Sequence, residues 1–370
     1  MSAISFTKTM SIDELRVAIP LLGETNTLII QSEPGCGKTS LLSMMAEDNG
    51  DKWRKPEDYF PDDKFVYIYV DCPVKDMSDV GMAIPNHESR TLEYYVADLF
   101  KMDDPRPKYI LLDEFAKSPK LMQVIYTRLM LERYVGDRSL TKGSRVFGTS
   151  NNASDGVGDS MLAHAGNRVT VVEMGKPKAP AWLTWAGAKG LSTVIRGFVG
   201  MYPRVLKSYR DGDQEDNPYI FHPKKHALSF ASPRSLEKAD NIIRLRDKMS
   251  ENSVECLLAG TIGVAASKDL SVFLSLEKSL PDVRKDIIPN PTKVDVPEQV
   301  AAQMMVMFQA IDVIESQDDL SAFMQFVNRI KLNEVQTVFF SMAMRDAKIR
   351  TLARRNQEIT DWCKENHEFV

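Results

Sequence analysis

The segment SEPGCGKT (32–39) has the residue types and spacing of a loop that binds phosphate. It follows the apolar run NTLIIQ and precedes a helix-like stretch. Gly35 and Gly37 let the backbone curl so that successive N–H groups face phosphate oxygens, and the following helix adds its positive N-terminal end. The Lys38 ammonium would bridge the β- and γ-phosphates, and the Thr39 hydroxyl would ligate magnesium. This spacing therefore predicts a site for a nucleoside triphosphate and Mg²⁺.

The loop departs from the pattern G-x-x-x-x-G-K-S/T at its first position, where Ser32 replaces glycine. That position sometimes needs a backbone conformation that only glycine adopts without strain. A glycine-rich turn between a strand and a helix, without any ligand, is the alternative interpretation. We assign the whole loop to nucleotide binding: Ser32, Glu33, Pro34, Gly35, Cys36, Gly37, Lys38, Thr39 and Ser40.

An acidic pair, Asp113 and Glu114, follows the apolar residues of the run YILLDEF. Carboxylates at the end of a buried strand are costly unless a cation lies beside them. We expect Asp113 to hold the magnesium through water, and Glu114 to accept a proton from the attacking water. A strand-end turn with two solvated carboxylates is the alternative, and the phosphate loop upstream favours the metal site.

Amide side chains end the next strand-like run, which reads VFGTSNN. Asn151 follows a β-rich stretch that would lie between the two strands described above. Its amide could therefore orient the lytic water or contact the γ-phosphate. Asn152 is a rival for this role, and capping of a turn after the strand is the alternative interpretation for Asn151.

Two arginines could stabilise the charge that grows on the γ-phosphate during transfer. Arg168 lies just before the last strand-like run, and Arg234 lies in the sequence Ser-Pro-Arg. In that sequence Ser232 can cap a helix and Pro233 can open it. One such arginine normally comes from a neighbouring subunit or a moving lid. Ordinary surface salt bridges are the alternative for both.

The elements that would position these residues alternate between strand and helix over residues 1–175. This alternation predicts a mainly parallel sheet with helices on both sides. The expected strands are 26–32, 64–72, 108–115, 144–151 and 167–174, and the expected helices are 11–22, 38–47, 92–101 and 118–134.

Strand signals stop after Gly175, and helix-like segments take over at 180–188, 190–199, 233–249, 252–266 and in a last block from about 297 to 370. A polar loop is expected at 209–219, and a proline-spaced segment at 280–298 precedes the last block. We therefore expect an αβα nucleotide-binding core (1–177), a helical lid (178–265) and a helical C-terminal extension (266–370).

The composition is that of a globular protein, and 370 residues predict two or three structural units. The net charge of -4 disfavours a protein that coats nucleic acid without specificity. The four cysteines are widely spaced, which favours free thiols over a zinc site. The start MSAISFTKTM lacks the features of a secretory signal, and no apolar stretch approaches the ~20 residues that span a bilayer. We therefore expect a cytoplasmic protein without a membrane segment.

These motifs, in this order, resemble an AAA+ ATPase, and more narrowly the MoxR group. The resemblance covers residues from about 32 to 250. Its narrower form depends on SEPGCGKT, SDVGM (78–82), LMLERYV (129–135), GTSNN (148–152) and SPRS (232–235). A variant of the group carries a W-x-x-W-A stretch, which is present here at 182–186. Plain packing of the two tryptophans in a helical core is the alternative interpretation of that stretch.

The resemblance implies an AAA+ P-loop three-layer αβα core with a parallel sheet, ATP and Mg²⁺ as cofactors, and ATP hydrolysis. It implies that Asn151 is sensor-1, that Arg168 is an arginine finger acting in trans, and that Arg234 is sensor-2 acting in cis. It also implies a homo-oligomer, a hexameric ring, because the finger must reach the next subunit's nucleotide. Asn152 stands where the family usually has proline, so the choice between Asn151 and Asn152 stays open.

Two classes of output are compatible with such a ring. In the first, it remodels or matures a protein client in a chaperone-like way, often with a von Willebrand A-type partner. An insert at 71–90 and a hairpin or loop at 135–144 would contact that partner, and passive surface connections are the alternative. In the second, the ring is a nucleic-acid motor or loader, which the basic run RDAKIRTLARR (345–355) would support. A solvated helix face also explains such a run.

Overall fold

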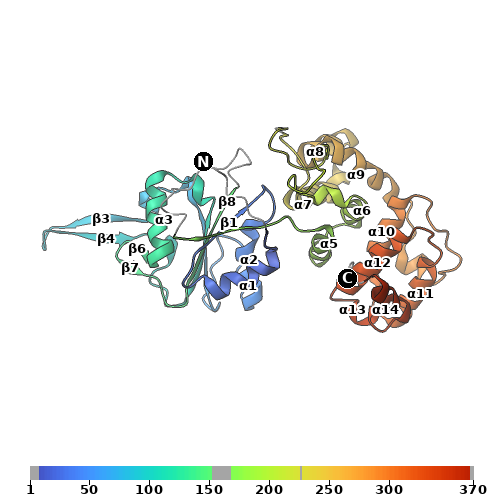
Figure 1. The fold of residues 1–370 in the computed structure, drawn as a ribbon, viewed down its shortest axis with the longest axis horizontal. Coiled ribbons are helices and arrows are strands. Elements are labelled where there is room, and N and C mark those ends of the chain that lie inside the picture. The colour runs from blue at the N-terminus through green and yellow to red at the C-terminus, as the bar shows by residue number, and fades with distance from the viewer. Residues whose placement is uncertain (1–7, 152–167, 226, 367–370) are drawn as a thin grey trace. The chain divides into compact units, whose positions relative to one another are not determined.

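The computed structural model describes residues 8–151, 168–225 and 227–366. The chain forms two compact units, residues 1–176 and 177–370 (Figure 1). Asn152, the rival candidate for sensor-1, lies outside the described residues. Within the described parts of the chain, no helix combines the length and the apolar character needed to cross a membrane.

The first unit is built on a parallel five-stranded sheet with the order β2-β5-β8-β1-β9. As predicted, β8 lies between β5 and β1, so the carboxyl ends of these three strands meet at one edge, where ligands bind in open α/β sheets. Each strand lies inside the run predicted for it: β1 (Leu28–Ser32), β2 (Val66–Asp71), β5 (Lys108–Asp113), β8 (Arg145–Asn151) and β9 (Thr170–Glu173).

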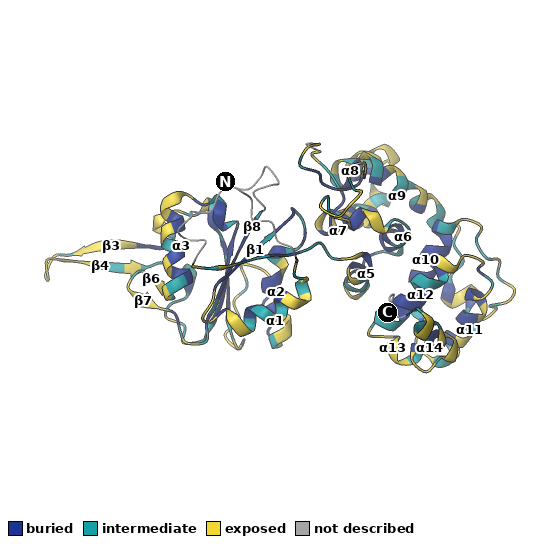
Figure 2. Ribbon diagram, in the orientation of Figure 1, coloured by how far each residue is buried: buried dark blue, intermediate teal, exposed yellow. Residues whose placement is uncertain are grey.

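Helices cover both faces of this sheet. α1 (Ile12–Leu22) and α2 (Leu41–Asn49) share an apolar core with Ile30, whereas α3 (Lys120–Glu132) shares another with Ile29. Ile29 and Ile30 face opposite sides because side chains alternate along a strand. Figure 2 shows the central strands as buried. The predicted three-layer α/β core with a parallel sheet is therefore confirmed.

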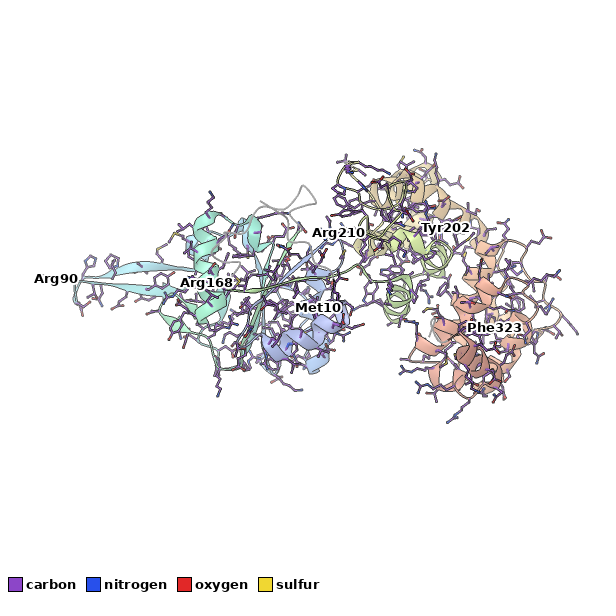
Figure 3. All side chains as sticks on the ribbon, viewed as in Figure 1. Met10, Arg90, Arg168, Tyr202, Arg210 and Phe323 are labelled. Atoms are coloured by element: carbon purple, nitrogen blue, oxygen red, sulfur yellow. The ribbon has the colours of Figure 1, made fainter. Side chains whose placement is uncertain are left out.

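The prediction of a helix over 92–101 is wrong. β3 (Gly81–Asn86) and β4 (Thr91–Val96) instead form an antiparallel ribbon, and a short 3-10 turn, η4 (Asp98–Phe100), follows it. The residues TLEYYV are rich in β-branched and aromatic types, which favour a strand, and pairing with the preceding segment overrides the helical spacing. The ribbon projects from the unit, and Arg90 lies at its tip (Figure 3).

The projecting ribbon is packed at its base against a second, shorter hairpin. This hairpin consists of β6 (Tyr134–Val135) and β7 (Arg138–Ser139), and Gly136 lies in its turn with φ +60°. A Cβ atom at Gly136 would collide with the ring of Tyr94. Glycine is therefore needed at this position for two reasons, its backbone conformation and the close approach of the tyrosine ring.

Among the described residues of the second unit, all regular elements are helices, joined by loops. One apolar core runs through it from Ala179 to Ile359. Trp182 is buried and its ring lies 6.0 Å from that of Trp185, consistent with core packing. The helices are α5 (Ala179–Ala188), α6 (Thr193–Met201), α7 (Pro233–Leu245), α8 (Glu251–Ile262), α9 (Val264–Glu277), α10 (Val300–Val313), α11 (Gln317–Val327), α12 (Asn333–Arg345), α13 (Arg350–Ala353) and α14 (Gln357–Glu365).

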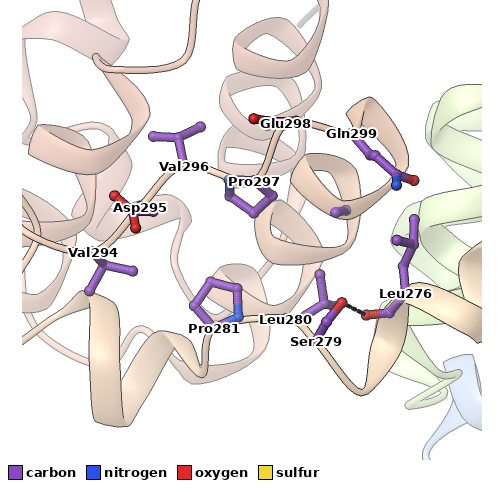
Figure 4. A pocket seen from close by; sticks show the side chains of 11 residues that line it. Leu276, Ser279, Leu280, Pro281, Val294, Asp295, Val296, Pro297, Glu298 and Gln299 are labelled. Atoms are coloured by element: carbon purple, nitrogen blue, oxygen red, sulfur yellow. Dashed lines mark hydrogen bonds between the residues drawn. The ribbon is translucent and has the colours of Figure 1, made fainter.

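The expected lid (178–265) and extension (266–370) both contribute side chains to this one core. Their division into two separate domains stays a prediction. An open groove of about 450 Å³ lies between the end of α9 and the segment 294–299 (Figure 4). Apolar side chains and two carboxylates, Asp295 and Glu298, line it. None of the predicted site residues takes part in that groove.

Candidate active site

The phosphate loop connects the end of β1 to a short 3-10 turn, η1 (Lys38–Ser40), which leads directly into α2. Gly35 and Gly37 adopt φ values of +78° and +94°, the left-handed region that favours glycine. Ser32 is not among the residues with positive φ, and it ends β1 in a strand pairing with Asn151. The position where the pattern has glycine therefore does not require a left-handed backbone conformation here.

Lys38 is buried, and its ammonium donates hydrogen bonds to two oxygens of the protein. One is the main-chain carbonyl of Ser32 at 3.0 Å, and the other is Oδ1 of Asn151 at 2.9 Å. The structure thus brings together the lysine of the loop and the amide at the end of β8. An ammonium that donates to neutral oxygens such as these is suited to exchange them for charged phosphate oxygens.

Asp113, at the end of β5, accepts hydrogen bonds from three hydroxyl groups. Thr39 Oγ1 and Tyr69 OH donate to Oδ2 at 3.2 and 2.9 Å, and Thr149 Oγ1 donates to Oδ1. The two predicted metal-binding residues, Thr39 and Asp113, are therefore in direct contact. A hydroxyl and a carboxylate are hard oxygen donors of the kind that Mg²⁺ accepts alongside phosphate and water, so the residues present fit that ion.

Glu114 follows Asp113 in a left-handed conformation with φ 51°, and its main-chain N–H donates to Thr149 Oγ1 at 3.1 Å. Its carboxylate lies 2.8 Å from the Lys117 ammonium, and Asn151 Nδ2 lies 3.5 Å from Oε1. The side chain is 37% exposed, so a water molecule can reach it. This geometry suits a general base at the edge of the site.

Tyr69 and Thr149 are contacts of the site that no motif identifies in the sequence. Tyr69 comes from β2 and Thr149 from β8, and both orient the Asp113 carboxylate. Burial and the nearby Asp113 charge raise the pKa of the Tyr69 hydroxyl. Tyr69 therefore stays protonated at neutral pH and remains a donor. Thr149 lies within the quoted GTSNN stretch, which is the one signal that could have indicated it.

Cys36 lies inside the loop as a buried free thiol. Burial raises the pKa of its thiol to about 11, so the reactive thiolate is scarce at neutral pH. All four cysteines are free thiols in the structure. Among the described residues, no group of three or more His, Cys, Asp or Glu side chains could hold a metal. The magnesium site would therefore depend on Thr39, Asp113 and the phosphates themselves.

The two predicted arginines lie in different units. Arg168 is exposed just before β9 in the first unit (Figure 3). Arg234 is exposed in the first turn of α7 in the second unit. That helix begins as predicted, because Ser232 Oγ accepts a hydrogen bond from the main chain at position 235 and Pro233 occupies the first turn. The roles of both arginines in catalysis stay predictions.

No protein-family model and no curated protein matches the chain. Similar solved structures include a protein of Cytophaga hutchinsonii described as a putative ATPase, with 12% identity, a TM-score of 0.33, and coverage of 73% of this chain and 88% of that one. They also include a K64R mutant of Thermotoga maritima RuvB, with 11% identity, a TM-score of 0.36, and coverage of 76% and 74%. Similarities this distant establish no family.

The strand order, the helices on both faces and the glycine conformations of the loop instead define the fold. The first unit has a P-loop α/β core. Within it, Lys38, Thr39, Asp113, Glu114 and Asn151 form one connected set of contacts at the carboxyl ends of β1, β5 and β8.

Replacing Tyr69 with phenylalanine is expected to raise the magnesium concentration that ATP turnover requires. The lost hydroxyl leaves the Asp113 carboxylate less firmly oriented, and a hydrogen bond to a charged group is worth about 1.5–3 kcal/mol. We expect about a tenfold higher magnesium requirement in a titration of ATP turnover. Tyr59→Phe, which removes an exposed tyrosine hydroxyl bound to Asp104, is the matched control. If the Tyr69→Phe variant requires the same magnesium concentration as the wild type, Tyr69 has no role in the magnesium site.

Proposed function

We propose that this protein hydrolyses ATP with Mg²⁺ as an AAA+ ATPase. The observation that carries the proposal is the contact of Lys38 with Asn151 and of Thr39 with Asp113, beside Glu114. Each of these side chains has the chemistry that phosphoryl transfer to water requires. Their meeting point is also the sheet edge where α/β proteins bind ligands.

In this mechanism the Lys38 ammonium exchanges the oxygens of Ser32 and Asn151 for oxygens of the triphosphate. Main-chain N–H groups of the loop bind further phosphate charge. Thr39 and Asp113 would hold magnesium, which when bound supplies positive charge beside the transferred phosphoryl group. The Glu114 carboxylate accepts the proton of the attacking water, and the Asn151 amide orients that water.

We further propose that the protein acts as a ring, of six subunits in the MoxR-like manner, and that the ring remodels a protein client. The β3–β4 ribbon supports a protein partner because it projects from the unit and is largely exposed (Figure 2). Met82, Leu92 and Tyr95 of this ribbon are 57%, 70% and 55% exposed. Exposed apolar side chains gathered on one projecting element favour contact with another protein.

A nucleic-acid motor is the second candidate, and the basic run at 345–355 is the observation that favours it. Arg350, Arg354 and Arg355 are exposed. However, Lys348 Nζ donates to the main-chain carbonyl of Asp312 at 2.6 Å, so part of the basic charge is used within the protein. Less positive charge is therefore available to bind nucleic acid than the composition of the run suggests.

Stimulation of ATP turnover distinguishes the two candidates. We expect single-stranded DNA, duplex DNA and RNA to stimulate ATP turnover only slightly. We also expect the Glu114→Gln variant, which holds ATP without hydrolysing it, to retain a specific co-expressed protein. A strong response to nucleic acid, with binding that weakens steeply as salt rises, would favour the motor instead. Absence of any ATP turnover under all these conditions would contradict the hydrolase itself.

Replacing Arg168 with alanine is expected to reduce ATP turnover by about 10³-fold or more while largely preserving nucleotide affinity, as for a residue that stabilises charge in the transition state. If Arg168 acts on the neighbouring subunit, mixing this variant with Lys38→Ala subunits will restore some activity. In such mixed rings, an intact finger faces an intact nucleotide site at some interfaces.

Arg355→Ala is the control, because it removes an exposed arginine of the second unit. Steady-state phosphate release over a series of mixing ratios measures the recovery. No recovery at any ratio would exclude an arginine that acts across a subunit interface.

A further inference from the structure

An ion pair with little solvent exposure joins the phosphate loop to the chain beyond β9, and it takes no part in the proposed mechanism. Glu33 occupies the second position of the loop, and its carboxylate lies 3.0 Å from the Lys176 ammonium. The side chains are only 6% and 3% exposed, respectively. Removing two charges from water is costly, so a pair at this depth needs a specific reason.

Strand pairing explains how two residues so far apart in sequence meet. β9 pairs with β1 in parallel, and the main-chain N–H of Met174 donates to the carbonyl of Gln31 at 2.7 Å. The chain beyond β9 therefore runs past the start of the loop. This places Lys176 beside Glu33 at the point where the backbone leaves the sheet to form the loop.

The negative charge of Glu33 is unfavourable for the binding of a triphosphate to the loop. A loop that receives a triphosphate benefits from positive charge, whereas Glu33 places a carboxylate inside it at low solvent exposure. Both charges act at the centre of the loop, on the Cys36 thiol between the two glycines. The Lys176 charge lowers the pKa of this thiol, and the Glu33 charge raises it. A carboxylate in the loop without the Lys176 charge beside it would repel bound phosphate.

We propose that Lys176 is a positioning residue that neutralises Glu33 and thereby allows the loop to bind polyphosphate. The inference rests on the proposed nucleotide site and deepens it, because no role in binding is otherwise assigned to Lys176. Lys176 acts through Glu33 and does not itself contact the nucleotide. Its removal takes the Lys176 positive charge away from the Glu33 carboxylate, and removal of both charges relieves the repulsion.

The dependence on ligand charge separates this role from a purely structural one. If the pair only holds the fold, its loss will weaken ATP and ADP binding by the same factor. If Lys176 neutralises Glu33, the loss will be larger for ATP than for ADP, because repulsion grows with the charge of the ligand.

The test compares Lys176→Met, Glu33→Gln and the double variant, using fluorescent analogues of ATP and ADP with the full chain. We expect Lys176→Met to weaken ATP binding by about tenfold or more, and ADP binding by less, as when one partner of a buried charge pair is lost. The double variant is expected to recover most of that loss. Glu33→Gln alone, which leaves the lysine charge in place, is expected to tighten ATP binding by about threefold.

Equal weakening of ATP and ADP, or a double variant as weak as Lys176→Met, would overturn the inference. If Lys176→Met does not fold, Glu33→Gln decides alone, since weaker ATP binding in that variant contradicts repulsion by Glu33. If the wild-type protein binds neither analogue, the proposed function is wrong. If the wild type binds them and Lys176→Met binds them equally well, only this inference is wrong.

Discussion

Replacing Lys38 with alanine is expected to abolish measurable ATP binding. The ammonium is the one side-chain cation that the phosphate-loop pattern assigns to the β- and γ-phosphates, and in the structure it is held ready by Ser32 and Asn151. Two charge-assisted hydrogen bonds of about 1.5–3 kcal/mol each correspond to an affinity loss of about 10²–10⁴-fold. Titration with a fluorescent ATP analogue measures this loss directly.

Lys120→Ala is the matched control for this experiment, because Lys120 is an exposed lysine at the start of α3 in the same unit. We expect its affinity for ATP to equal that of the wild type. Thermal unfolding of both variants checks that the fold is preserved. A Lys38→Ala protein that still binds ATP within a few-fold of the wild type would contradict the placement of the triphosphate in this loop.

The Glu114→Gln variant is expected to bind ATP normally but to turn it over about 10²–10⁴-fold more slowly, because general base catalysis contributes a factor of that size. Glutamine keeps the shape of the side chain and can still contact Asn151, but it cannot accept the proton of water. The bound nucleotide should therefore remain ATP rather than ADP when it is extracted from the protein.

Single-turnover hydrolysis of radiolabelled ATP separates this effect from a defect in binding or in product release. Glu132→Gln serves as the control, since Glu132 is an exposed carboxylate on α3 paired with Arg128. If Glu114→Gln hydrolyses ATP at the rate of the wild type, another group must accept the proton, and the assignment of Glu114 is wrong.

The core of the site could be predicted because its residues follow strands that the sequence marks clearly. Apolar runs precede the phosphate loop, the pair Asp113 and Glu114, and Asn151, and parallel strands bring their carboxyl ends to one edge. The expected position of β8, between β5 and β1, agrees with the strand order of the sheet. For these residues the local pattern and the sheet topology agree.

The contacts of Tyr69 and Thr149 with Asp113 could not be predicted, because they depend on the register of neighbouring strands. Hydroxyl side chains on strands are common, and only the pairing shows which of them face a carboxylate. The ion pair of Glu33 and Lys176 has the same origin, since it joins residues brought together by β1 and β9. Thr149 and Glu33 lie within recognisable motifs, but nothing along the chain indicates which residues they contact.

The helix expected at 92–101 failed for a different reason. Its apolar spacing fits a helix, but Leu92 and Tyr95 are exposed on a ribbon whose pairing with β3 determines its conformation. Strand propensity depends on such pairing more than helix propensity does. The projecting ribbon was therefore visible in the sequence only as an insert of undefined structure.

A structure of the protein with Mg²⁺ and a non-hydrolysable ATP analogue tests the central claim most directly. We predict the triphosphate in the loop 32–39, with Lys38 Nζ moved from Asn151 to the phosphate oxygens and the metal beside Thr39 and Asp113. Density for the analogue elsewhere, or a loop that stays closed around Lys38 at saturating analogue, would contradict the account.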